Sequence, residues 1–428
     1  MNLHDFKKIG IIGFAREGKS LLRFLEKIDF KGEVFVMDTD ISIDYPDTLL
    51  NVSMLLGKTY LDSICDLDLV FKSSGVPSNL PKILDAKKNG VKFSNQINLF
   101  FSLNKKPVIA VSGTKGKSST VTFIDNVLKI ADIKSQLIGN IGNPAIDYLY
   151  DDIDYYVFEI SSYMLEDFEG EIDYGIFTSF FPDHMDVHGS YENYKNAKFR
   201  FFDVCKKLVI NDQNQDLKNH LIENDISYTP FDSCKVKFSN NTLHYLGASY
   251  SYQNNLGLEI QSNFKGAIEF LLDTGISLNY ILKGIETFKK LPFRQEIYKA
   301  KKGVIFVNDS ASITPESTIA AINNFKDNLN VLILGGQDRG YDYSMLNKLI
   351  TDLQIPNVFV LPDLDSVGFS FDYKVCPNLE FLTDCLRDLN LESGVVLFSP
   401  GGPSYNFYKN FHDRGDCFFK EISKRFPL

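Results

Sequence analysis

The stretch VIAVSGTKGKSSTVTFI, residues 108–124, carries the pattern that decides the fold of this chain. An apolar run typical of a buried strand ends at Ser112, two glycines follow, and Lys117 opens a helical pattern. A strand, a glycine-rich turn and a helix in this order indicate either a loop that binds phosphate or a polar turn between two ordinary elements. The G-K-S triplet between the strand and the helix favours the phosphate loop.

A phosphate loop gives each of its parts a role. We expect the main-chain amides from Thr114 to Ser118 to surround an anion, with the helix N-terminus adding positive potential. The Lys117 ammonium can reach a terminal phosphate, and the Ser118 hydroxyl can ligate Mg²⁺. The usual G-x-x-x-x-G-K-S spacing is not met, because Val111 takes the place of the first glycine. The predicted phosphate-binding residues are Gly113, Thr114, Lys115, Gly116, Lys117, Ser118 and Ser119.

Strand-like runs alternate with helical stretches on both sides of this loop, which predicts βαβ units around parallel sheets. A new series of strands begins after residues 100–107 and another near residue 291. We therefore expect an α/β protein with three domains, at 1–102, 103–290 and 291–428. Residues from about 230 to 260 have poorer periodicity and are predicted to form hairpins or an insertion.

The composition excludes several classes of protein. The chain has 428 residues, 44% of them hydrophobic, which is enough for two or three cores. Its net charge is −10 with dispersed lysines, which argues against a main role in nucleic-acid binding. No apolar run reaches the ~18 residues of a membrane span, and no secretory signal is seen. The six cysteines lack paired zinc spacings. We expect a soluble cytoplasmic protein without membrane or nucleic-acid partners.

The chain resembles the Mur ligase family, and its MurD-type members in particular, from end to end. The phosphate loop has the G-T-x-G-K-S form found in that family. Each further motif is short, and their order and spacing carry the resemblance. These motifs are GNIG (139–142), FEISSYMLE (158–166), DHMD (183–186), NAKFRFF (196–202), LPFRQE (291–296), NDS (308–310), LGGQDRG (334–340) and SPGGPSYNFYKNFHDRGDCF (399–418).

The resemblance implies both an architecture and a reaction. It implies a Rossmann-like UDP-substrate domain, a central P-loop ATPase-like domain and a Rossmann-like C-terminal domain that contacts the amino acid and ATP. The implied enzyme is an ATP-dependent ligase of peptidoglycan synthesis, with ATP and two Mg²⁺ ions as cofactors. It would add D-glutamate to UDP-N-acetylmuramoyl-L-alanine through an acyl phosphate. Small molecules are the implied partners, and we expect a monomer.

The resemblance also assigns residues to the reaction. Catalytic roles fall to Lys117, Lys198 and His184, and ATP contacts beyond the loop fall to Asn263, Arg294 and Asp309. The implied metal ligands are Ser118, Glu159, His184 and Lys198, the last if it is carbamylated. The implied UDP-substrate residues are Phe14, Ala15, Arg16, Asp38, Thr39, Ser73, Ser74, Gly75 and Asn140. The implied glutamate residues are Arg339, Ser404 and Phe411.

Simpler interpretations stand beside these roles. Taken alone, Glu159 is more simply interpreted as a capping group and Lys198 as a surface lysine. Arg294 could form part of a surface ion pair. Helix caps are the alternative for Asn263 and Asp309. His188, four residues after His184, receives no role.

The sequence also departs from the family pattern on the amino-acid side. Ala311-Ser312-Ile313 replaces a lysine-alanine-threonine triplet, and Met164 replaces a glutamine. Glu259-Ile260 stands in place of the His-Asn pair of another family motif. L-glutamate as the added amino acid is therefore the main competing reading.

Other function classes compete from further away. Gly10, Gly13 and Gly18, with Asp38 after the next strand, suggest an NAD-binding oxidoreductase, although the spacing is not G-x-G-x-x-G. A P-loop protein that binds nucleotide without ligase chemistry is another alternative, as is a relative of folylpolyglutamate synthetase. The glycine turn about a hundred residues before the phosphate loop argues against the last.

Overall fold

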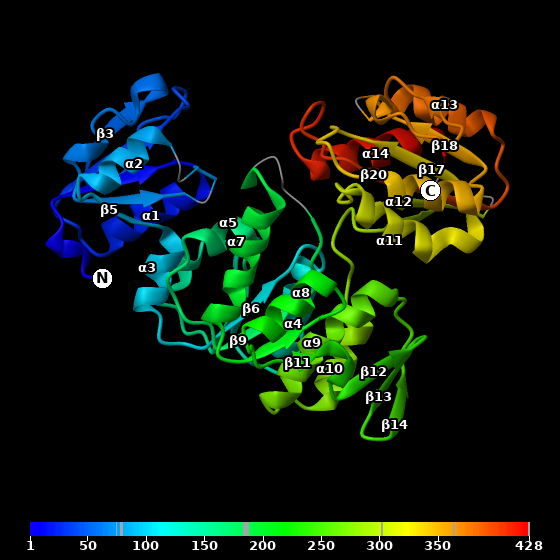
Figure 1. The fold of residues 1–428 in the computed structure, drawn as a ribbon, viewed down its shortest axis with the longest axis horizontal. Helices are drawn as coiled ribbons and strands as arrows, with labels where there is room; N and C mark the ends of the chain where they lie inside the picture. The colour runs from blue at the N-terminus through cyan, green and yellow to red at the C-terminus, as the bar shows by residue number, and fades with distance from the viewer. Residues whose placement is uncertain (74, 78–79, 183–187, 301–302, 363, 427–428) are drawn as a thin grey trace. The chain divides into compact units, whose positions relative to one another are not determined.

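The computed structural model describes every residue except 74, 78–79, 183–187, 301–302, 363 and 427–428 (Figure 1). The chain forms two compact units. The first contains Met1–Gln253 and Ser262–Thr287, and the second contains Asn254–Gln261 and Phe288–Leu428. Among the described residues, no helix is long and apolar enough to cross a bilayer.

The first unit begins with a five-stranded parallel sheet in the order β3-β2-β1-β4-β5. Its strands are β1 (Lys8–Ile12), β2 (Glu33–Asp38), β3 (Asn51–Leu56), β4 (Leu69–Lys72) and β5 (Lys92–Ser94). Its helices are α1 (Arg16–Lys27), α2 (Pro81–Lys88) and α3 (Gln96–Leu103). The strand order reverses between β1 and β4, and ligands of open α/β sheets bind at the carboxyl ends of strands at such a point.

The second sheet of this unit is also parallel, in the order β11-β10-β9-β6-β8-β7. Its strands are β6 (Val108–Ser112), β7 (Ser135–Gly139), β8 (Tyr155–Glu159), β9 (Tyr174–Phe177), β10 (Leu208–Ile210) and β11 (Thr229–Pro230). Every residue of the inner strand β6 is buried, which explains its continuous apolar run. The helices that follow along the chain are α4 (Lys117–Ile130), α5 (Ser162–Glu166), α7 (Tyr191–Val204), α8 (Gln215–Glu223), α9 (Leu258–Asp273) and α10 (Leu278–Thr287).

The stretch of poorer periodicity forms an antiparallel three-stranded sheet of consecutive hairpins. Its strands are β12 (Val236–Ser239), β13 (Thr242–Tyr245) and β14 (Ala248–Ser251). Leu246 and Gly247, which join the last two strands, both have positive φ, as a tight two-residue hairpin turn requires. The hairpin form of the prediction for about 230–260 is confirmed.

The second unit is built on a six-stranded sheet in the order β15-β16-β20-β17-β18-β19. Only β15 pairs antiparallel. The strands are β15 (Glu296–Lys299), β16 (Val304–Asn308), β17 (Leu329–Gly335), β18 (Asn357–Val360), β19 (Lys374–Val375) and β20 (Gly394–Gly401). The helices are α11 (Pro315–Phe325), α12 (Ser344–Leu353), α13 (Leu379–Asp388) and α14 (Phe411–Arg425).

Alternate residues of β17 point to separate apolar clusters on the two faces of this sheet. Ile333 joins a cluster with Leu382 of α13 and Phe418 of α14. Leu332 joins a different cluster with Ile322 of α11 and Leu346 of α12. Helices therefore cover both faces, as in a doubly wound fold.

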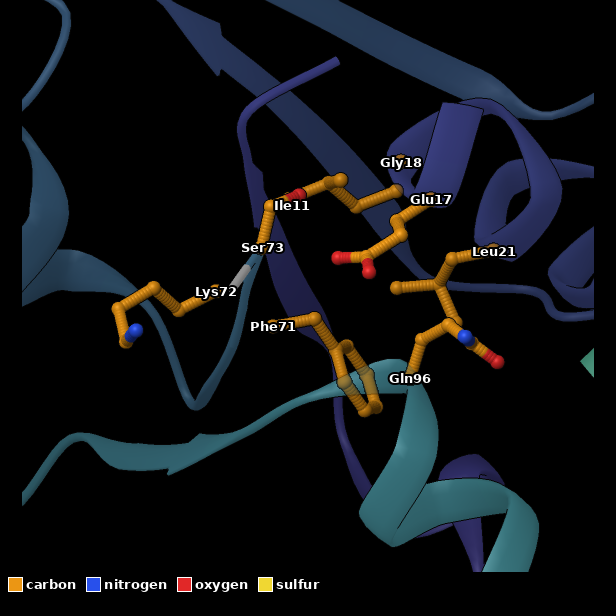
Figure 2. Close-up of a pocket in the computed structure, with 8 residues that line it drawn as sticks. All are labelled: Ile11, Glu17, Gly18, Leu21, Phe71, Lys72, Ser73 and Gln96. Atoms are coloured by element: carbon orange, nitrogen blue, oxygen red, sulfur yellow. The ribbon is translucent and has the colours of Figure 1, made fainter. Parts of the chain in front are cut away.

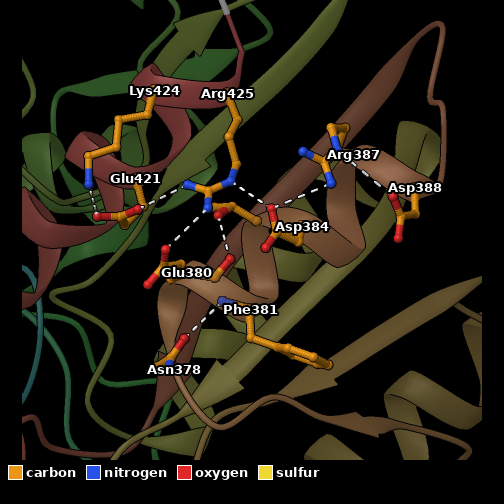
Figure 3. A network of polar contacts seen from close by, with 10 residues as sticks. Asn378, Glu380, Phe381, Asp384, Arg387, Asp388, Glu421, Lys424 and Arg425 are labelled. Atoms are coloured by element: carbon orange, nitrogen blue, oxygen red, sulfur yellow. Dashed lines mark hydrogen bonds and ion pairs between the residues drawn. The ribbon is translucent and has the colours of Figure 1, made fainter.

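An ion-pair network joins α13 to α14 at the surface (Figure 3). The Arg425 guanidinium lies 2.8 Å from Asp384, 3.2 Å from Glu421 and 3.7 Å from Glu380. Because the Asp384 and Glu380 side chains are 41% and 74% exposed, we expect their ion pairs with Arg425 to stabilise the helix pair only modestly.

Side-chain caps fix the starts of several helices, because each accepts a hydrogen bond from an otherwise unpaired amide of the first turn. These caps are Asn95 for α3, Ser161 for α5, Ser190 for α7, Asn214 for α8, Asn378 for α13 and Asn410 for α14. Short 3-10 turns lie at Leu3–Asp5, Gly57–Thr59, Ile64–Asp66, Ala145–Tyr148, Phe231–Ser233, Lys326–Asn328 and Asp365–Val367. The predicted α/β class with parallel sheets is confirmed, and the domain boundaries at 102/103 and 290/291 stay predictions.

Candidate active site

The predicted phosphate loop joins the buried strand β6 to the N-terminus of α4. Gly113 has a φ of 130° and Gly116 a φ of 86°. A Cβ atom at Gly113 would collide with Thr178, and one at Gly116 would collide with the side-chain amide of Asn263. Glycine is therefore required at both positions for backbone and steric reasons. The contact also places Asn263, a predicted ATP residue, against the loop.

Two amides of the loop are bonded differently from our expectation. The Thr114 amide donates to the backbone oxygen of Ser179 at 2.8 Å, and the Lys115 amide donates to the Ser179 hydroxyl at 2.9 Å. Both amides are thus bonded within the protein in this structure, and their part in a cradle for an anion stays a prediction. The first turn of α4, which begins at Lys117, still presents N–H groups that an α-helix does not bond internally. An anion would bind at that turn.

Two lysine ammonium groups meet at the loop carbonyls. Lys117 Nζ donates to the backbone oxygens of Gly113 and Thr114, each at 2.8 Å. Lys198 Nζ, from α7, donates to the same Gly113 oxygen at 2.8 Å and lies 3.4 Å from Ser112 Oγ. Lys198 is only 3% exposed, so the surface-lysine alternative is wrong. The loop therefore carries two positive charges of which one is buried.

A buried carboxylate stands beside the loop on the adjacent strand β8. Glu159 pairs in register with Val111 of β6 and is 1% exposed. Its Oε1 accepts a hydrogen bond from Asn140 Nδ2 at 2.7 Å. Its Oε2 is buried and has no hydrogen-bond partner among the described residues. Ser161 caps the next helix, so the capping alternative for Glu159 is wrong.

An unpartnered buried carboxylate oxygen is costly unless a cation neutralises it. Oxygen ligands of this kind suit Mg²⁺, and Ser118 supplies a hydroxyl in the first turn of α4. These residues fit a magnesium ion. His184, the other predicted ligand, lies outside the described residues, and so do Asp183 and Asp186. Among the described residues, no cluster of three His, Cys, Asp or Glu side chains could hold a metal.

His188 has a local structural environment. Its Nε2 lies 3.0 Å from Ser162 Oγ, and its Nδ1 lies 2.9 Å from a carboxylate oxygen of Glu166. Its ring stacks on Tyr163. These contacts fix the ring against α5, consistent with our having given His188 no role.

The predicted UDP-substrate residues partly converge at the carboxyl ends of β1, β2 and β4. The Phe14 amide donates to Asp38 Oδ2 at 2.7 Å, and Ser73 Oγ donates to the Gly13 oxygen at 2.9 Å. This is the edge where the strand order reverses. Phe14, Asp38 and Ser73 therefore lie around one crevice edge.

The other predicted UDP-substrate residues are more dispersed. Ala15, Thr39 and Gly75 are exposed, and Ser74 is outside the described residues. The Arg16 guanidinium donates to the Gly142 oxygen at 2.9 Å, near the end of β7. Asn140 bonds to Glu159 in the second sheet.

A buried polar network occupies the carboxyl ends of β16 and β20 in the second unit. Asp309 is 4% exposed, and its Oδ2 accepts hydrogen bonds from Ser312 Oγ at 2.5 Å and Ser399 Oγ at 2.9 Å. The Gln295 amide donates to its Oδ1 at 3.1 Å. Burial raises the pKa of Asp309 to about 7, and these hydrogen bonds oppose the rise. Asp309 begins no helix, so the cap alternative is wrong; its ribose role stays a prediction.

A second buried charge lies next to this network. Arg414 of α14 is 1% exposed and donates to Ser310 Oγ at 3.0 Å, to the Ser310 oxygen at 2.7 Å and to the Gly402 oxygen at 2.8 Å. Burial lowers the pKa of Arg414 to about 10. The side chain thus ties the motifs NDS, SPGG and FHDRGD into one edge of the sheet.

The predicted glutamate residues lie along the same edge. The Gln337 amide donates to the Pro403 oxygen at 2.7 Å, which joins the loop that carries Arg339 to the loop that carries Ser404. The Arg339 guanidinium lies 5.7 Å from the centre of the Tyr405 ring. Phe411 accepts a hydrogen bond from Ser310 Oγ through its backbone oxygen.

The buried position of Asp309 makes a testable prediction about pH. Between pH 3.8 and about 7 the folded state retains a proton that the unfolded state has lost. The free energy of unfolding should therefore fall as pH rises through this window, by at most about 1.4 kcal/mol per unit from this group. Asp309→Asn lacks this contribution, so its thermal midpoint should rise relative to wild type between pH 5 and pH 7.5.

Circular dichroism melts at several pH values measure this difference. Asp352→Asn, at an exposed position of α12, is the matched control and should follow wild type at every pH. A difference between Asp309→Asn and wild type that stays constant with pH would contradict the buried, protonated state.

Several residues of this site were not predicted from the sequence. They are Ser179, which accepts hydrogen bonds from two loop amides, Thr178, which leaves no space for a side chain at position 113, and the buried Arg414 and Ser399. The only available signal was the placement of TS directly after the apolar run YGIF, next to a strand that ends at the phosphate loop.

Comparison with known proteins agrees with this geometry. Residues 111–269 match the model of the Mur ligase middle domain, and residues 7–94 match that of the Mur ligase MurD-like N-terminal domain. A protein of Acetivibrio thermocellus named UDP-N-acetylmuramoylalanine–D-glutamate ligase is 28% identical over 471 residues, covering 98% of each chain. A protein of the same name from Streptococcus pneumoniae is 29% identical over 445 residues, covering 98% of this chain and 97% of that protein.

A solved structure supports the fold. The crystal structure of MurF ligase from Thermotoga maritima in complex with ADP aligns with a TM-score of 0.62 at 13% identity. The alignment covers 97% of this chain and 95% of that one. At this identity the likeness concerns the fold alone.

Proposed function

The chain belongs to the Mur ligase family, and from this premise we propose that it joins D-glutamate to UDP-N-acetylmuramoyl-L-alanine at the expense of ATP. The observation that carries the proposal is the grouping of charges around the phosphate loop. Lys117 and Lys198 both donate to the Gly113 oxygen, and the buried Glu159 ends the adjacent strand. Such a group suits the transfer of a phosphoryl group, whose charge must be neutralised as it moves.

The proposed reaction has two steps. The carboxylate of the alanine attacks the γ-phosphorus of ATP, which forms an acyl phosphate and releases ADP. The amino group of glutamate then attacks the acyl carbon, an amide bond forms, and inorganic phosphate leaves while the amine loses a proton.

The residues of the loop would bind and orient the nucleotide. The first turn of α4 would hold phosphate oxygens, and Lys117 would shift from the loop carbonyls to the terminal phosphate. Asn263 would contact the adenine, and its position against Gly116 places it beside the nucleotide-binding loop. Arg294 would contact the phosphates of ATP, and Asp309 the ribose.

Glu159 and Ser118 would hold magnesium, together with His184 and with Lys198 if it is carbamylated. When bound, Mg²⁺ supplies positive charge to the phosphate oxygens. The buried Oε2 of Glu159, which has no donor among the described residues, supports this role. The number of ions, two in our expectation, is part of the proposal.

The UDP group and the incoming glutamate would be bound by residues outside the phosphate loop. Phe14, Asp38 and Ser73 at the β1/β4 edge support a UDP site there. Arg339, with Ser404 and Phe411, would bind the glutamate, because a guanidinium forms two-pronged pairs with carboxylates. The Ser312 hydroxyl bonds Asp309 in this structure, so it offers no obvious replacement for the polar contacts that the triplet at 311–313 lacks.

A phosphate-release assay tests the function directly. ATP, Mg²⁺ and UDP-N-acetylmuramoyl-L-alanine would be supplied with D-glutamate or L-glutamate in parallel reactions. We expect turnover with D-glutamate and little with L-glutamate. Turnover with L-glutamate alone would replace the proposed substrate by its mirror image. ATP binding without phosphate release in either reaction would instead indicate a nucleotide-binding protein.

The location and the oligomeric state are also proposals. Use of ATP and of a UDP-linked substrate supports a cytoplasmic location. We propose a monomer, which size-exclusion chromatography with light scattering would test.

A further inference from the structure

Lys72, the last residue of β4, is a buried lysine that the proposed chemistry does not use. It is 9% exposed, and it directly precedes the loop that carries Ser73 and Gly75. Its Nζ donates to the backbone oxygen of Val76 at 2.8 Å, on the far side of that loop. The side chain therefore links the end of β4 to Val76 in the following loop.

Among the described residues, the ammonium group of Lys72 pairs with the carboxylate of Asp167, which directly follows α5 in the same unit. Asp167 Oδ2, in the segment after α5, lies 3.4 Å from Lys72 Nζ. Asp167 is itself held in place, because its backbone oxygen accepts a hydrogen bond from Asn98 Nδ2 at 2.6 Å. The Asn98 side chain also accepts from the Glu169 amide. The ion pair thus anchors the loop to a fixed point.

A small pocket lined by both apolar and polar residues adjoins Lys72 (Figure 2). Lys72 and Ser73 lie on one side of it, and Glu17 and Gln96 lie on the other. An adjoining pocket shares Lys72, Glu17 and Gln96 and extends to Asp167. Lys72 and Ser73, at the start of the loop, therefore line a pocket together with residues of α1 and α3.

We propose that Lys72 is a positioning residue that holds the loop after β4 in the shape that binds the UDP-linked substrate. The inference rests on the proposed function, because Ser73 and Gly75 are assigned to that substrate there. Lys72 acts through the Val76 oxygen and Asp167 and makes no contact with reacting atoms. Ordering the loop before binding lowers the cost of binding, so its loss acts on substrate affinity and not on the chemical step.

The test compares Lys72→Met, which keeps an unbranched apolar stem without the charge, with Lys72→Arg, which restores it. We expect Lys72→Met to raise the KM for UDP-N-acetylmuramoyl-L-alanine by about tenfold or more, since the loop loses the ammonium that bonds the Val76 oxygen and pairs with Asp167. The KM for ATP and kcat should stay near the wild-type values, and Lys72→Arg should recover part of the loss. Lys82→Met, an exposed lysine of α2, is the matched control.

Hydrogen–deuterium exchange on the ligand-free protein gives a readout that does not depend on activity. The amides of Ser73, Gly75 and Val76 should exchange faster in Lys72→Met than in wild type or Lys82→Met. If Lys72→Met does not fold, Asp167→Asn replaces it, because the Asp167 backbone bond to Asn98 does not need the carboxylate.

The outcomes separate this inference from the proposed function. Absence of turnover in the wild-type protein would contradict the proposed function. Faster exchange in Lys72→Met would still support the role of Lys72 in shaping the loop. Unchanged exchange, or an equal change in kcat and in both KM values, would overturn the inference while the ligase activity stands.

Discussion

Lys117→Met should lower ATP-dependent phosphate release by about 1000-fold or more, a loss of ~4 kcal/mol of transition-state stabilisation. In the ligand-free structure the Lys117 ammonium donates to the oxygens of Gly113 and Thr114, at the mouth of the helix that would bind the phosphates. When ATP binds, we expect the ammonium to leave these oxygens and to bind the terminal phosphate. Methionine keeps the unbranched stem and removes only the charge. Steady-state phosphate release under saturating substrates measures the effect.

The matched control for this variant is Lys129→Met at the other end of the same helix. Lys129 is largely exposed and pairs with Asp125, so its loss should leave turnover nearly unchanged. Thermal melts of both variants check that the loop is intact, because Lys117→Met also loses two hydrogen bonds to loop carbonyls. Near-normal turnover in a folded Lys117→Met protein would contradict the proposal that this loop binds the phosphates of ATP.

Glu159→Gln should lower turnover by about 100-fold or more and raise the Mg²⁺ concentration needed for half-maximal rate. The amide keeps an oxygen for the bond from Asn140 and loses the charge that would attract the ion. Because Glu159 Oε2 is buried and no described residue donates a hydrogen bond to it, the charge is costly to the protein without Mg²⁺. The variant should therefore be at least as stable as wild type, which thermal melts without Mg²⁺ measure.

The combination of lost activity and retained stability is the signature of a ligand site. A structural carboxylate would show the opposite, a lower melting midpoint with activity per folded molecule unchanged. Glu223→Gln, at an exposed position of α8, serves as the control for the substitution itself. Unaltered Mg²⁺ dependence in Glu159→Gln would contradict the metal role.

Much of the fold could be predicted because the patterns that specify it are local. The apolar run of β6, the two glycines and the lysine that opens α4 are neighbours in sequence, and their periodicity and turn chemistry follow from their own backbone. The same holds for the βαβ alternation that predicted the parallel sheets. Only the stretch at about 230–260 left two forms open, because its strands are short and half exposed.

The candidate site could be predicted in its residue types and less well in its contacts. A lysine in a helical pattern is predicted to be exposed. Lys198 is buried instead, because α7 places its ammonium group at the Gly113 oxygen, 85 residues away in the sequence. The sequence predicts loop amides that are free to bind an anion. In the structure, Ser179 accepts hydrogen bonds from two of them across 64 or more residues. Neither contact has a local signal.

The sequence by itself determined the phosphate loop, the alternation of strands and helices, and the family to which the chain belongs. The tertiary structure alone decided which charges are buried and what they meet, as with the carboxylate of Glu159, the Asp309 network and the Lys72–Asp167 ion pair. The physical reason is the distance along the chain over which each kind of interaction acts. Backbone preference and periodicity act over a few residues, whereas burial and hydrogen-bond partners depend on the packing of segments far apart in the chain.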